Sequence, residues 1–288
     1  MLTSATLDRE LDARVFAKCE NLQKCGAFKA RGACNAVFAL DGAAAGRGVV
    51  THSSGNHAAA LAYAARARGI PCAVVMPDTA PAVKVAAVRG YGAEIRFCKA
   101  SEREAVCATV QRERGATLVH PFEDPFVIAG QGTAALELLE DVPGLDAVIA
   151  PVGGGGLCAG TAVVVRALRP AASVLAAEPK AVDDAARSLA TGLRQPRVEG
   201  ARSWADGLMT GLGEPNFRLL MRHAVRVVTV DEDAIVDACR FFVQRMKIVV
   251  EPSAATVLAA LRIIAGELRG KRIGMVISGG NTDFAWLH

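Results

Sequence analysis

One lysine lies in a setting that can turn an amine into a nucleophile or a base. Lys29 stands in the segment GAFKARG, between Phe28 and Ala30, at the edge of the apolar run GACNAVFAL. Burial disfavours the charged form of an amine and lowers its pKa. A lysine at a helix start can instead extend its charged end into solvent, and this is the more common fate of a single lysine. Taken alone, the segment leaves both interpretations open.

Three turns rich in small residues each follow an apolar run. They lie in the segments VVTHSSGNHAAALAYAA, VIAPVGGGGLCAGTAVVV and MVISGGNTDF. Backbone N–H groups at a helix start bind phosphate or carboxylate, and Gly153 to Gly156 carry no Cβ to keep an anion away. Such glycines can also serve only to let a helix pack tightly on its strand. Three turns of this kind in one chain favour anion binding.

A dinucleotide site is a competing interpretation of the glycine run. Gly154, Gly156 and Ala159 satisfy the pattern G-x-G-x-x-A after an expected strand, and Glu178 ends the next strand, where an acid that binds ribose belongs. Four successive glycines exceed what that turn needs, however, and the other two turns stay unexplained by it. We therefore do not favour it.

The elements that must position these groups alternate along the chain. Apolar or β-branched runs predict strands at 15–19, 48–51, 72–76, 94–98, 147–151, 174–177, 225–230 and 272–277. Helices are expected to fill most of the intervals, notably 56–68, 102–114, 128–140, 157–168, 232–246 and 253–268. This alternation predicts an α/β fold with mainly parallel sheets.

Composition narrows the class of protein. The 288 residues include 33 basic and 29 acidic side chains, interspersed rather than clustered, so neither nucleic acid nor a membrane surface is expected as a partner. Eight cysteines lack Cys-x-x-Cys or zinc-ligand spacing, and the first residues, MLTSATLDRELDAR, do not form a signal peptide. We expect a cytoplasmic protein with reduced thiols.

The ordered set of motifs resembles one enzyme family. ENLQKCGAFKARGACNAV, THSSGNHAAALAYAARARGIPCAVVMP, HPFEDPFVIAGQGTAALELL, PVGGGGLCAG, AAEPKAVDD, ADGLMTGLG, EPSAA and ISGGN occur in the order found in fold-type II pyridoxal-phosphate enzymes of the serine racemase and serine/threonine dehydratase family. The resemblance covers nearly the whole chain. It implies a large cofactor-binding domain of residues 1–47 and 124–288, a small domain of residues 48–123, and a homodimer.

The resemblance assigns roles to the cofactor site. Lys29 would hold pyridoxal 5'-phosphate as a Schiff base with Phe28 against its ring, and Ser278 would lie beside the pyridine nitrogen. The phosphate would be held by Gly153, Gly154, Gly155 and Gly156, and the 3-oxygen by Asn56. The substrate carboxylate would be surrounded by Ser53, Ser54, Gly55 and His57.

The implied reaction is loss of water from serine, threonine or 3-hydroxyaspartate to give a 2-oxo acid and ammonia. Racemisation is the alternative, since it needs a second acid/base opposite Lys29, and the family's racemases use a serine at the position of Ser54. Hydroxyaspartate dehydratases keep this serine too, and Phe122 looks more like the threonine dehydratases. Arg103 and Thr210 match positions near the distal end of the substrate, where an arginine favours a second carboxylate.

Two further sites follow from the resemblance. Glu178, Asp184 and the carbonyl of Val182 match a divalent-cation site, and such oxygen ligands suit Mg²⁺ or Ca²⁺. As a pair of acids at a helix start they can also be merely solvated. Lys24, Tyr91, Arg245 and Lys247 match a nucleotide-effector site, but basic side chains on a helix face are usually solvated, so an ATP effector is not favoured.

The ends of the chain carry the last expectations. The chain begins closer to the lysine motif than family members usually do, which keeps open a catalytically silent, amino-acid-binding relative. It ends soon after ISGGN, so no C-terminal regulatory domain is expected.

Overall fold

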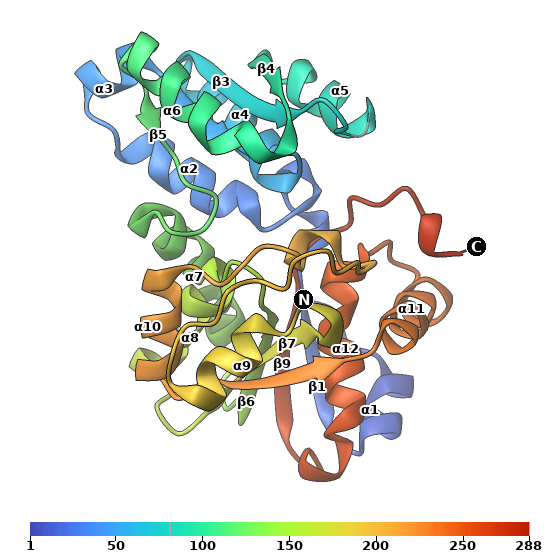
Figure 1. Ribbon diagram of the computed structural model, residues 1–288. Coiled ribbons are helices and arrows are strands. Elements are labelled where there is room, and N and C mark those ends of the chain that lie inside the picture. Colours follow the sequence, from blue (N-terminus) through green and yellow to red (C-terminus); the bar gives the residue numbers. More distant parts are fainter. Residues whose placement is uncertain (81, 288) are drawn as a thin grey trace. The chain divides into compact units, whose positions relative to one another are not determined.

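A computed structural model describes residues 1–80 and 82–287 (Figure 1). The chain divides into two compact units, a large unit of residues 1–28 and 131–288 and a small unit of residues 29–130. The small unit is longer than the predicted small domain, which began at residue 48. The reason is that helix α2 (Lys29–Ala39) packs against helix α4 (Asn56–Arg68), within the small unit.

The large unit contains a five-stranded sheet in the order β1-β9-β6-β7-β8, in which all adjacent pairs are parallel. Its strands are β1 (Arg14–Cys19), β6 (Ala147–Pro151), β7 (Ser173–Pro179), β8 (Arg226–Val230) and β9 (Arg272–Ile277). Its helices are α1 (Ala5–Leu11), α8 (Gly156–Leu168), α9 (Asp184–Thr191), α10 (Glu214–Arg222), α11 (Glu232–Phe241) and α12 (Pro252–Ile263). A π-helical turn, Phe242–Met246, continues α11, so the predicted helix ends in a wider turn.

The core of the large unit lies on both faces of this sheet because its inner strands β6, β7 and β9 are mostly apolar and buried. Alternate residues such as Ile149, Leu175 and Ile273 pack in one cluster with α1, α11 and α12. Their neighbours in β6, Val148 and Ala150, are also fully buried, and they face the side on which α8 lies. Figure 1 shows α8 and α10 on one side of the sheet and α1, α11 and α12 on the other. A parallel sheet buried on both faces is typical of α/β proteins.

The small unit contains a four-stranded sheet in the order β4-β3-β2-β5, also parallel in every pair. Its strands are β2 (Val49–His52), β3 (Cys72–Pro77), β4 (Glu94–Cys98) and β5 (Thr117–Leu118). Its helices, besides α2 and α4, are α3 (Gly42–Arg47), α5 (Ala82–Gly90) and α6 (Arg103–Arg114), and helix α7 (Pro125–Asp141) carries residues of both units. The strand β5 has two residues, too few to produce a periodic signal, and the sequence does not predict it.

Side-chain alternation also builds the core of the small unit. Val50, Ala73 and Val75 pack with Cys107 and Val110 of α6. The intervening residues Thr51, Val74 and Met76 are fully buried as well. The sequence-based α/β class with mainly parallel sheets is therefore confirmed.

Candidate active site

Lys29 is the first residue of α2 and is half-buried. Its Nζ donates a 2.6 Å hydrogen bond to the carbonyl oxygen of Pro121. Pro121 lies in a turn that is closed by the ring of His120, whose Nδ1 accepts from the N–H of Glu123 at 3.1 Å. The partner of the lysine amine within the small unit is thus a backbone carbonyl. Because every residue has one, such a partner cannot be predicted from residue types.

Two further rings line the same turn of the small unit. The His52 and His120 rings meet edge to face at 5.3 Å between centroids, and the His120 and Phe122 rings do so at 4.7 Å. Burial is the main cause that lowers the pKa of His52, and burial together with His52 and Lys29 lowers the pKa of His120 to about 4. Both rings are therefore neutral near pH 7.

The turn of Ser53, Ser54 and Gly55 connects β2 to the start of α4. The Ser53 hydroxyl accepts from the N–H of Gly55 at 3.3 Å, whereas the Ser54 hydroxyl makes no hydrogen bond to the described residues. Asn56 opens the helix. First-turn N–H groups of a helix lack partners within the helix and attract anions.

His57 acts in this turn through its backbone and not through its ring. The ring is buried and its Nε2 lies 3.1 Å from the carbonyl oxygen of Val119, so Nε2 carries the proton and donates. Burial, followed by the charge of Lys29, lowers the pKa of His57 to about 3. A neutral ring fixed on Val119 cannot form an ion pair with a carboxylate, which leaves the backbone N–H of His57 as the group that can face one.

Arg103 begins α6 in the same unit and is half-buried. Its guanidinium forms no ion pair or hydrogen bond with any described residue, although its charge contributes to the lowered pKa of His52. A half-buried arginine without a partner near the Ser53–Gly55 turn is a ready site for an added carboxylate.

The large unit carries the other predicted residues. Gly153 to Gly156 are buried between the end of β6 and the start of α8. The N–H groups of Gly153, Gly154 and Gly155 donate no hydrogen bond within the described part of the chain. Buried N–H groups normally have partners. A row of such donors at a helix start fits a phosphate group.

The structure also gives these glycines a packing role. A Cβ on Gly153 would lie 2.8 Å from Cα of Leu208, and one on Gly155 would lie 2.7 Å from Cδ1 of Leu212. Gly155 has a φ of +92°, which side chains rarely allow. The tight-packing interpretation is therefore supported by these close approaches, and anion binding by the glycine N–H groups stays a prediction.

Phe28 and Ser278 lie together in the large unit. The N–H of Phe28 donates to the carbonyl of Ser278 at 2.9 Å, and Ala27 and Gly279 form an antiparallel bridge. Ser278 is buried, and its hydroxyl makes no hydrogen bond to the described residues. The segment leading into Lys29 is thereby fixed to the end of β9.

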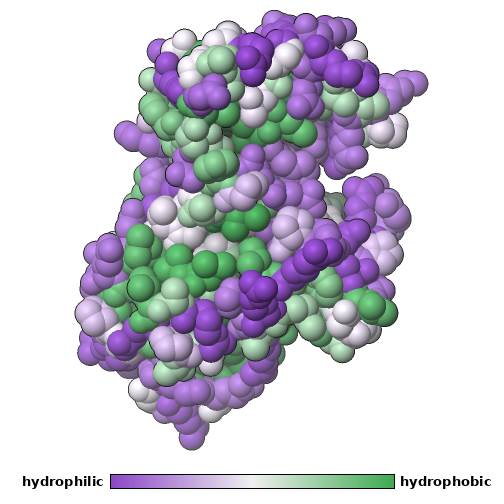
Figure 2. Space-filling view, turned by 90° about the vertical axis from the view of Figure 1, so that its left-hand side faces the viewer, coloured by the Kyte–Doolittle hydropathy of each residue, from purple (hydrophilic) through white to green (hydrophobic). Residues whose placement is uncertain are grey.

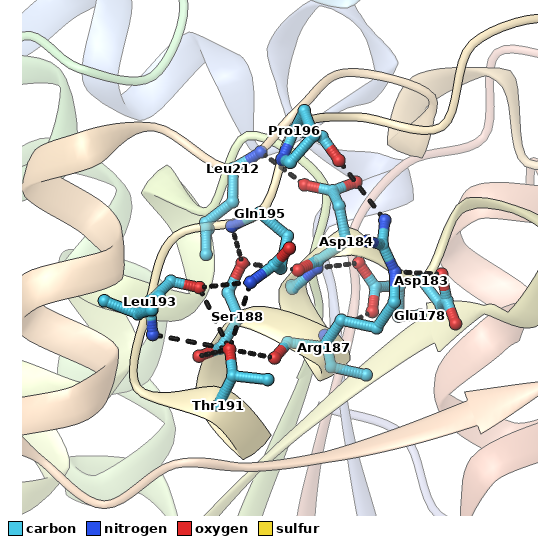
Figure 3. Close-up of polar contacts among 12 residues, drawn as sticks. Glu178, Asp183, Asp184, Arg187, Ser188, Thr191, Leu193, Gln195, Pro196 and Leu212 are labelled. Carbon is cyan, nitrogen blue, oxygen red and sulfur yellow. Dashed lines mark hydrogen bonds and ion pairs between the residues drawn. The ribbon is translucent and has the colours of Figure 1, made fainter.

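The three predicted metal ligands lie close in sequence at the end of β7 and the start of α9, and Figure 3 shows Glu178 and Asp184 among their polar contacts. Glu178 is buried and accepts from the N–H groups of Ala185 and Ala186, both at 2.8 Å. Burial raises its pKa to about 8, against the opposing effect of these two N–H groups. Burial likewise raises the pKa of Asp184, although Leu212 donates its N–H to Oδ2 at 2.8 Å.

These surroundings bear on both interpretations of Glu178, as a ribose-binding acid of a dinucleotide site and as a metal ligand. A carboxylate that is buried and bonded through both oxygens to its own chain is poorly placed for a ribose hydroxyl. Among the described residues no three His, Cys, Asp or Glu side chains gather as a metal-binding group. The divalent-cation site therefore stays a prediction from the resemblance.

The structure also describes the surroundings of the remaining predicted residues. Thr210 is half-buried in the loop before α10, and its hydroxyl has no hydrogen-bond partner in the described chain. Lys24, Arg245 and Lys247 are exposed, and the Tyr91 ring meets that of Tyr63 in the small unit. Sequence reasoning missed Pro121, which acts through its carbonyl, and Asn216, which donates to the carbonyl of Gly154 at 2.6 Å.

No helix in the described part of the chain is long and apolar enough to cross a membrane.

The fold agrees with the one expected for pyridoxal-phosphate enzymes of fold type II. Its large unit has a parallel sheet with a buried glycine turn, and its small unit has a half-buried lysine at a helix start. Residues 1–279 match the pyridoxal-phosphate dependent enzyme family, and the chain belongs to it. The predicted family, the enzyme class and pyridoxal phosphate as cofactor are confirmed, and the dinucleotide interpretation is not supported.

Known relatives match over nearly their full length. The chain is 48% identical to the beta-hydroxyaspartate dehydratase of Paracoccus denitrificans, over 98% of this chain and 90% of that protein. It is 46% identical to the serine racemase of Dictyostelium discoideum, over 99% of this chain and 90% of that one. A solved structure of a threonine deaminase from T.th. superposes with a TM-score of 0.93 at 46% identity, covering 99% of this chain and 92% of that one.

Proposed function

We propose that this protein removes water from a small β-hydroxy amino acid, serine, threonine or 3-hydroxyaspartate, and releases a 2-oxo acid and ammonia. The observation that carries the proposal is the Lys29 amine held at 2.6 Å by the carbonyl of Pro121, at the start of a helix and beside two neutral histidines. Relatives named as a dehydratase and as L-threo-3-hydroxyaspartate ammonia-lyase, at 48% and 45% identity, support this choice of reaction.

Residues of both units are assigned to one cofactor molecule by the family resemblance. Lys29 would hold the cofactor covalently, Phe28 would lie against its ring, Asn56 would bind its 3-oxygen, and the N–H groups of Gly153 to Gly156 would bind its phosphate. The Ser278 hydroxyl, which has no partner in the described chain, suits the pyridine nitrogen. When bound, pyridoxal phosphate supplies an electron sink that makes the Cα proton of an amino acid acidic.

Lys29 then acts as the base. With the cofactor and an amino acid bound, the amine of Lys29 would be the group that takes up the Cα proton. The hydrogen bond from Nζ to the carbonyl of Pro121 fixes the position of the amine, and His52 and His120 beside it are uncharged near pH 7. The substrate carboxylate is held by the turn of Ser53 to Gly55 and by the backbone N–H of His57.

The substrate that we favour is 3-hydroxyaspartate. Arg103 offers a half-buried guanidinium with no ion-pair partner among the described residues, which suits the second carboxylate of that substrate. Serine and threonine carry no such group, and Thr210 would contact the distal end of any of the three. The Paracoccus relative is named for β-hydroxyaspartate.

Racemisation of serine or aspartate is the second candidate function. The observation that favours it is the Ser54 hydroxyl, which is half-exposed and makes no hydrogen bond to described residues, so it is available as the second acid/base. Several relatives, including that of Dictyostelium, are named serine racemase.

We also propose a divalent-cation site of Glu178, Asp184 and the carbonyl of Val182, occupied by Mg²⁺ or Ca²⁺. Its support is that both acids are buried and lie close in sequence, at the end of β7 and the start of α9. A cation that binds here raises the thermal unfolding midpoint of the protein in proportion to the logarithm of its concentration. A midpoint unchanged by either cation after chelation would exclude the site.

A homodimer and a cytoplasmic location complete the proposal. Val163 and Leu168 of α8 and Met221 of α10 are exposed by 39%, 52% and 42%. Figure 2 shows hydrophobic surface on the face that carries these helices at the left of Figure 1. Exposed apolar patches on a large unit support self-association. Sedimentation velocity tests the dimer, and cell fractionation tests the location.

One experiment tests the function. The absorbance spectrum of the purified protein is recorded before and after adding L-serine, L-threonine and L-threo-3-hydroxyaspartate in turn, and the 2-oxo acid released is assayed. We expect a band at roughly 410 nm, where such lysine-linked cofactors absorb. It should be absent in Lys29→Ala and should change as oxo acid forms.

Other outcomes separate the alternatives. A band without oxo acid directs the test to chiral analysis of the recovered amino acid, where racemised product supports the second function and unchanged substrate indicates a silent binder. A protein that cannot be loaded with pyridoxal phosphate would refute the proposal.

A further inference from the structure

The carbonyl of Gly154 is held by two donors from one short segment. The N–H of Gly213 donates to it at 3.1 Å and the side-chain amide of Asn216 at 2.6 Å. Asn216 lies in the first turn of α10 and is completely buried. A peptide carbonyl and the N–H of the next residue point in opposite directions across a trans bond. Fixing the Gly154 carbonyl towards α10 therefore directs the N–H of Gly155 away from α10.

Packing closes the α10 side of this turn. A Cβ on Gly155 would lie 2.8 Å from Cβ of Asn216 as well as 2.7 Å from Cδ1 of Leu212. No ligand atom fits between the turn and these two side chains. The N–H of Gly155 can therefore be approached only from the side opposite Asn216.

The segment that carries the two donors is itself anchored. The N–H of Leu212 donates to Asp184 Oδ2 at 2.8 Å, as Figure 3 shows, and its carbonyl accepts from Nη1 of Arg194 at 3.1 Å. Arg194 also pairs through Nε with Oε2 of Glu214 at 3.0 Å. Both ends of the Leu212–Glu214 stretch are thus fixed before Asn216 is reached, so its amide has a defined position relative to the turn.

We propose that Asn216 is a positioning residue for the phosphate group of the cofactor. Through the Gly154 carbonyl it holds the glycine turn in the orientation that presents the Gly155 N–H to the phosphate, while touching neither phosphate nor substrate. The inference rests on the proposed binding of pyridoxal phosphate and extends it to a residue outside the glycine turn.

The test compares two ligands that differ only in the phosphate. Dissociation constants of pyridoxal phosphate and of pyridoxal, which lacks the phosphate, are measured by absorbance titration of the cofactor-free protein. In Asn216→Leu, which keeps the shape but removes the donor, we expect the affinity for pyridoxal phosphate to fall at least tenfold, about 1.4 kcal/mol. The affinity for pyridoxal should stay within twofold, and the ³¹P resonance of the bound phosphate should shift.

Two variants guard against a general loss of structure. Asn216→Asp replaces the donating group by an oxygen of the same shape and should behave like Asn216→Leu at neutral pH, so the test survives if one of them fails to fold. Leu220→Ala removes a fully buried side chain from the same helix without touching the turn, and it should change both affinities by the same factor.

The outcomes are distinct. Equal weakening of both ligands in the Asn216 variants, or unchanged affinity for pyridoxal phosphate, would overturn the positioning role. A wild-type protein that binds neither ligand would instead refute the proposed function itself.

Discussion

Replacing Gly155 by alanine tests the geometry of the phosphate turn most directly. The added Cβ would lie 2.7 Å from Cδ1 of Leu212 and 2.8 Å from Cβ of Asn216, inside the closest approach that real Cβ atoms show. The backbone there has a φ of +92°, which penalises any side chain. Left-handed backbone costs about 1–2 kcal/mol for a residue with a Cβ, and overpacking of a buried site costs about 1–3 kcal/mol. We expect Gly155→Ala to lower the free energy of unfolding by about 2–5 kcal/mol.

The assay is urea unfolding of the cofactor-free protein, followed by circular dichroism, so that ligand affinity does not enter the result. The matched control is Gly266→Ala in the same unit, where an added Cβ meets nothing within 4 Å and φ is not positive. This control should change the free energy of unfolding by less than about 0.5 kcal/mol. If Gly155→Ala were as stable as Gly266→Ala, the described packing of Leu212 and Asn216 behind the turn would be wrong.

Three further predictions concern the small unit. Because burial lowers the pKa of His57 to about 3, the unfolded chain binds a proton below pH 6.5 that the folded chain excludes, so the free energy of unfolding should fall on acidification by about 1.4 kcal/mol per pH unit. In urea unfolding measured across this pH range, His57→Gln should make the free energy of unfolding depend less on pH. His223→Gln, at a less buried histidine, should have a smaller effect. Arg103→Gln should raise the KM for 3-hydroxyaspartate about 10–100-fold and leave the KM for serine nearly unchanged. The control Arg112→Gln, on the same helix, should change neither KM. An equal effect of Arg103→Gln on both substrates would contradict binding of the second carboxylate by Arg103. Ser54→Ala should reduce any racemase rate, measured by chiral analysis, at least about 100-fold. Water elimination, measured by release of oxo acid, should persist. A parallel loss of both activities would assign Ser54 to substrate binding instead.

Short sequence motifs and the order in which they occur were enough to predict the family and the fold. The eight predicted strands appear in the structure, and the alternation of strands and helices was enough to predict the α/β class. Lys29 and Gly153 to Gly156 could be noted as candidates from their own short segments, because an amine beside apolar residues and N–H groups at a helix start are visible from sequence neighbours. Only the resemblance carried by the ordered set of motifs favoured a catalytic Lys29 and gave Ser54 a role.

The roles of other residues depend on partners far along the chain. Pro121 lies 92 positions from Lys29 and Asn216 lies 62 from Gly154, and in each hydrogen bond one partner is a backbone carbonyl, which every residue possesses. The role of His57 likewise could not be predicted from neighbouring residues. Its ring is hydrogen-bonded to Val119 only because α4 packs beside the end of β5, which Val119 follows. Sequence by itself determined which groups bring the chemistry, because residue type sets reactivity. Only the tertiary structure decided which backbone atoms hydrogen-bond to these groups and orient them. The reason is that every residue has the same carbonyl, and only folding brings a particular one next to a particular side chain.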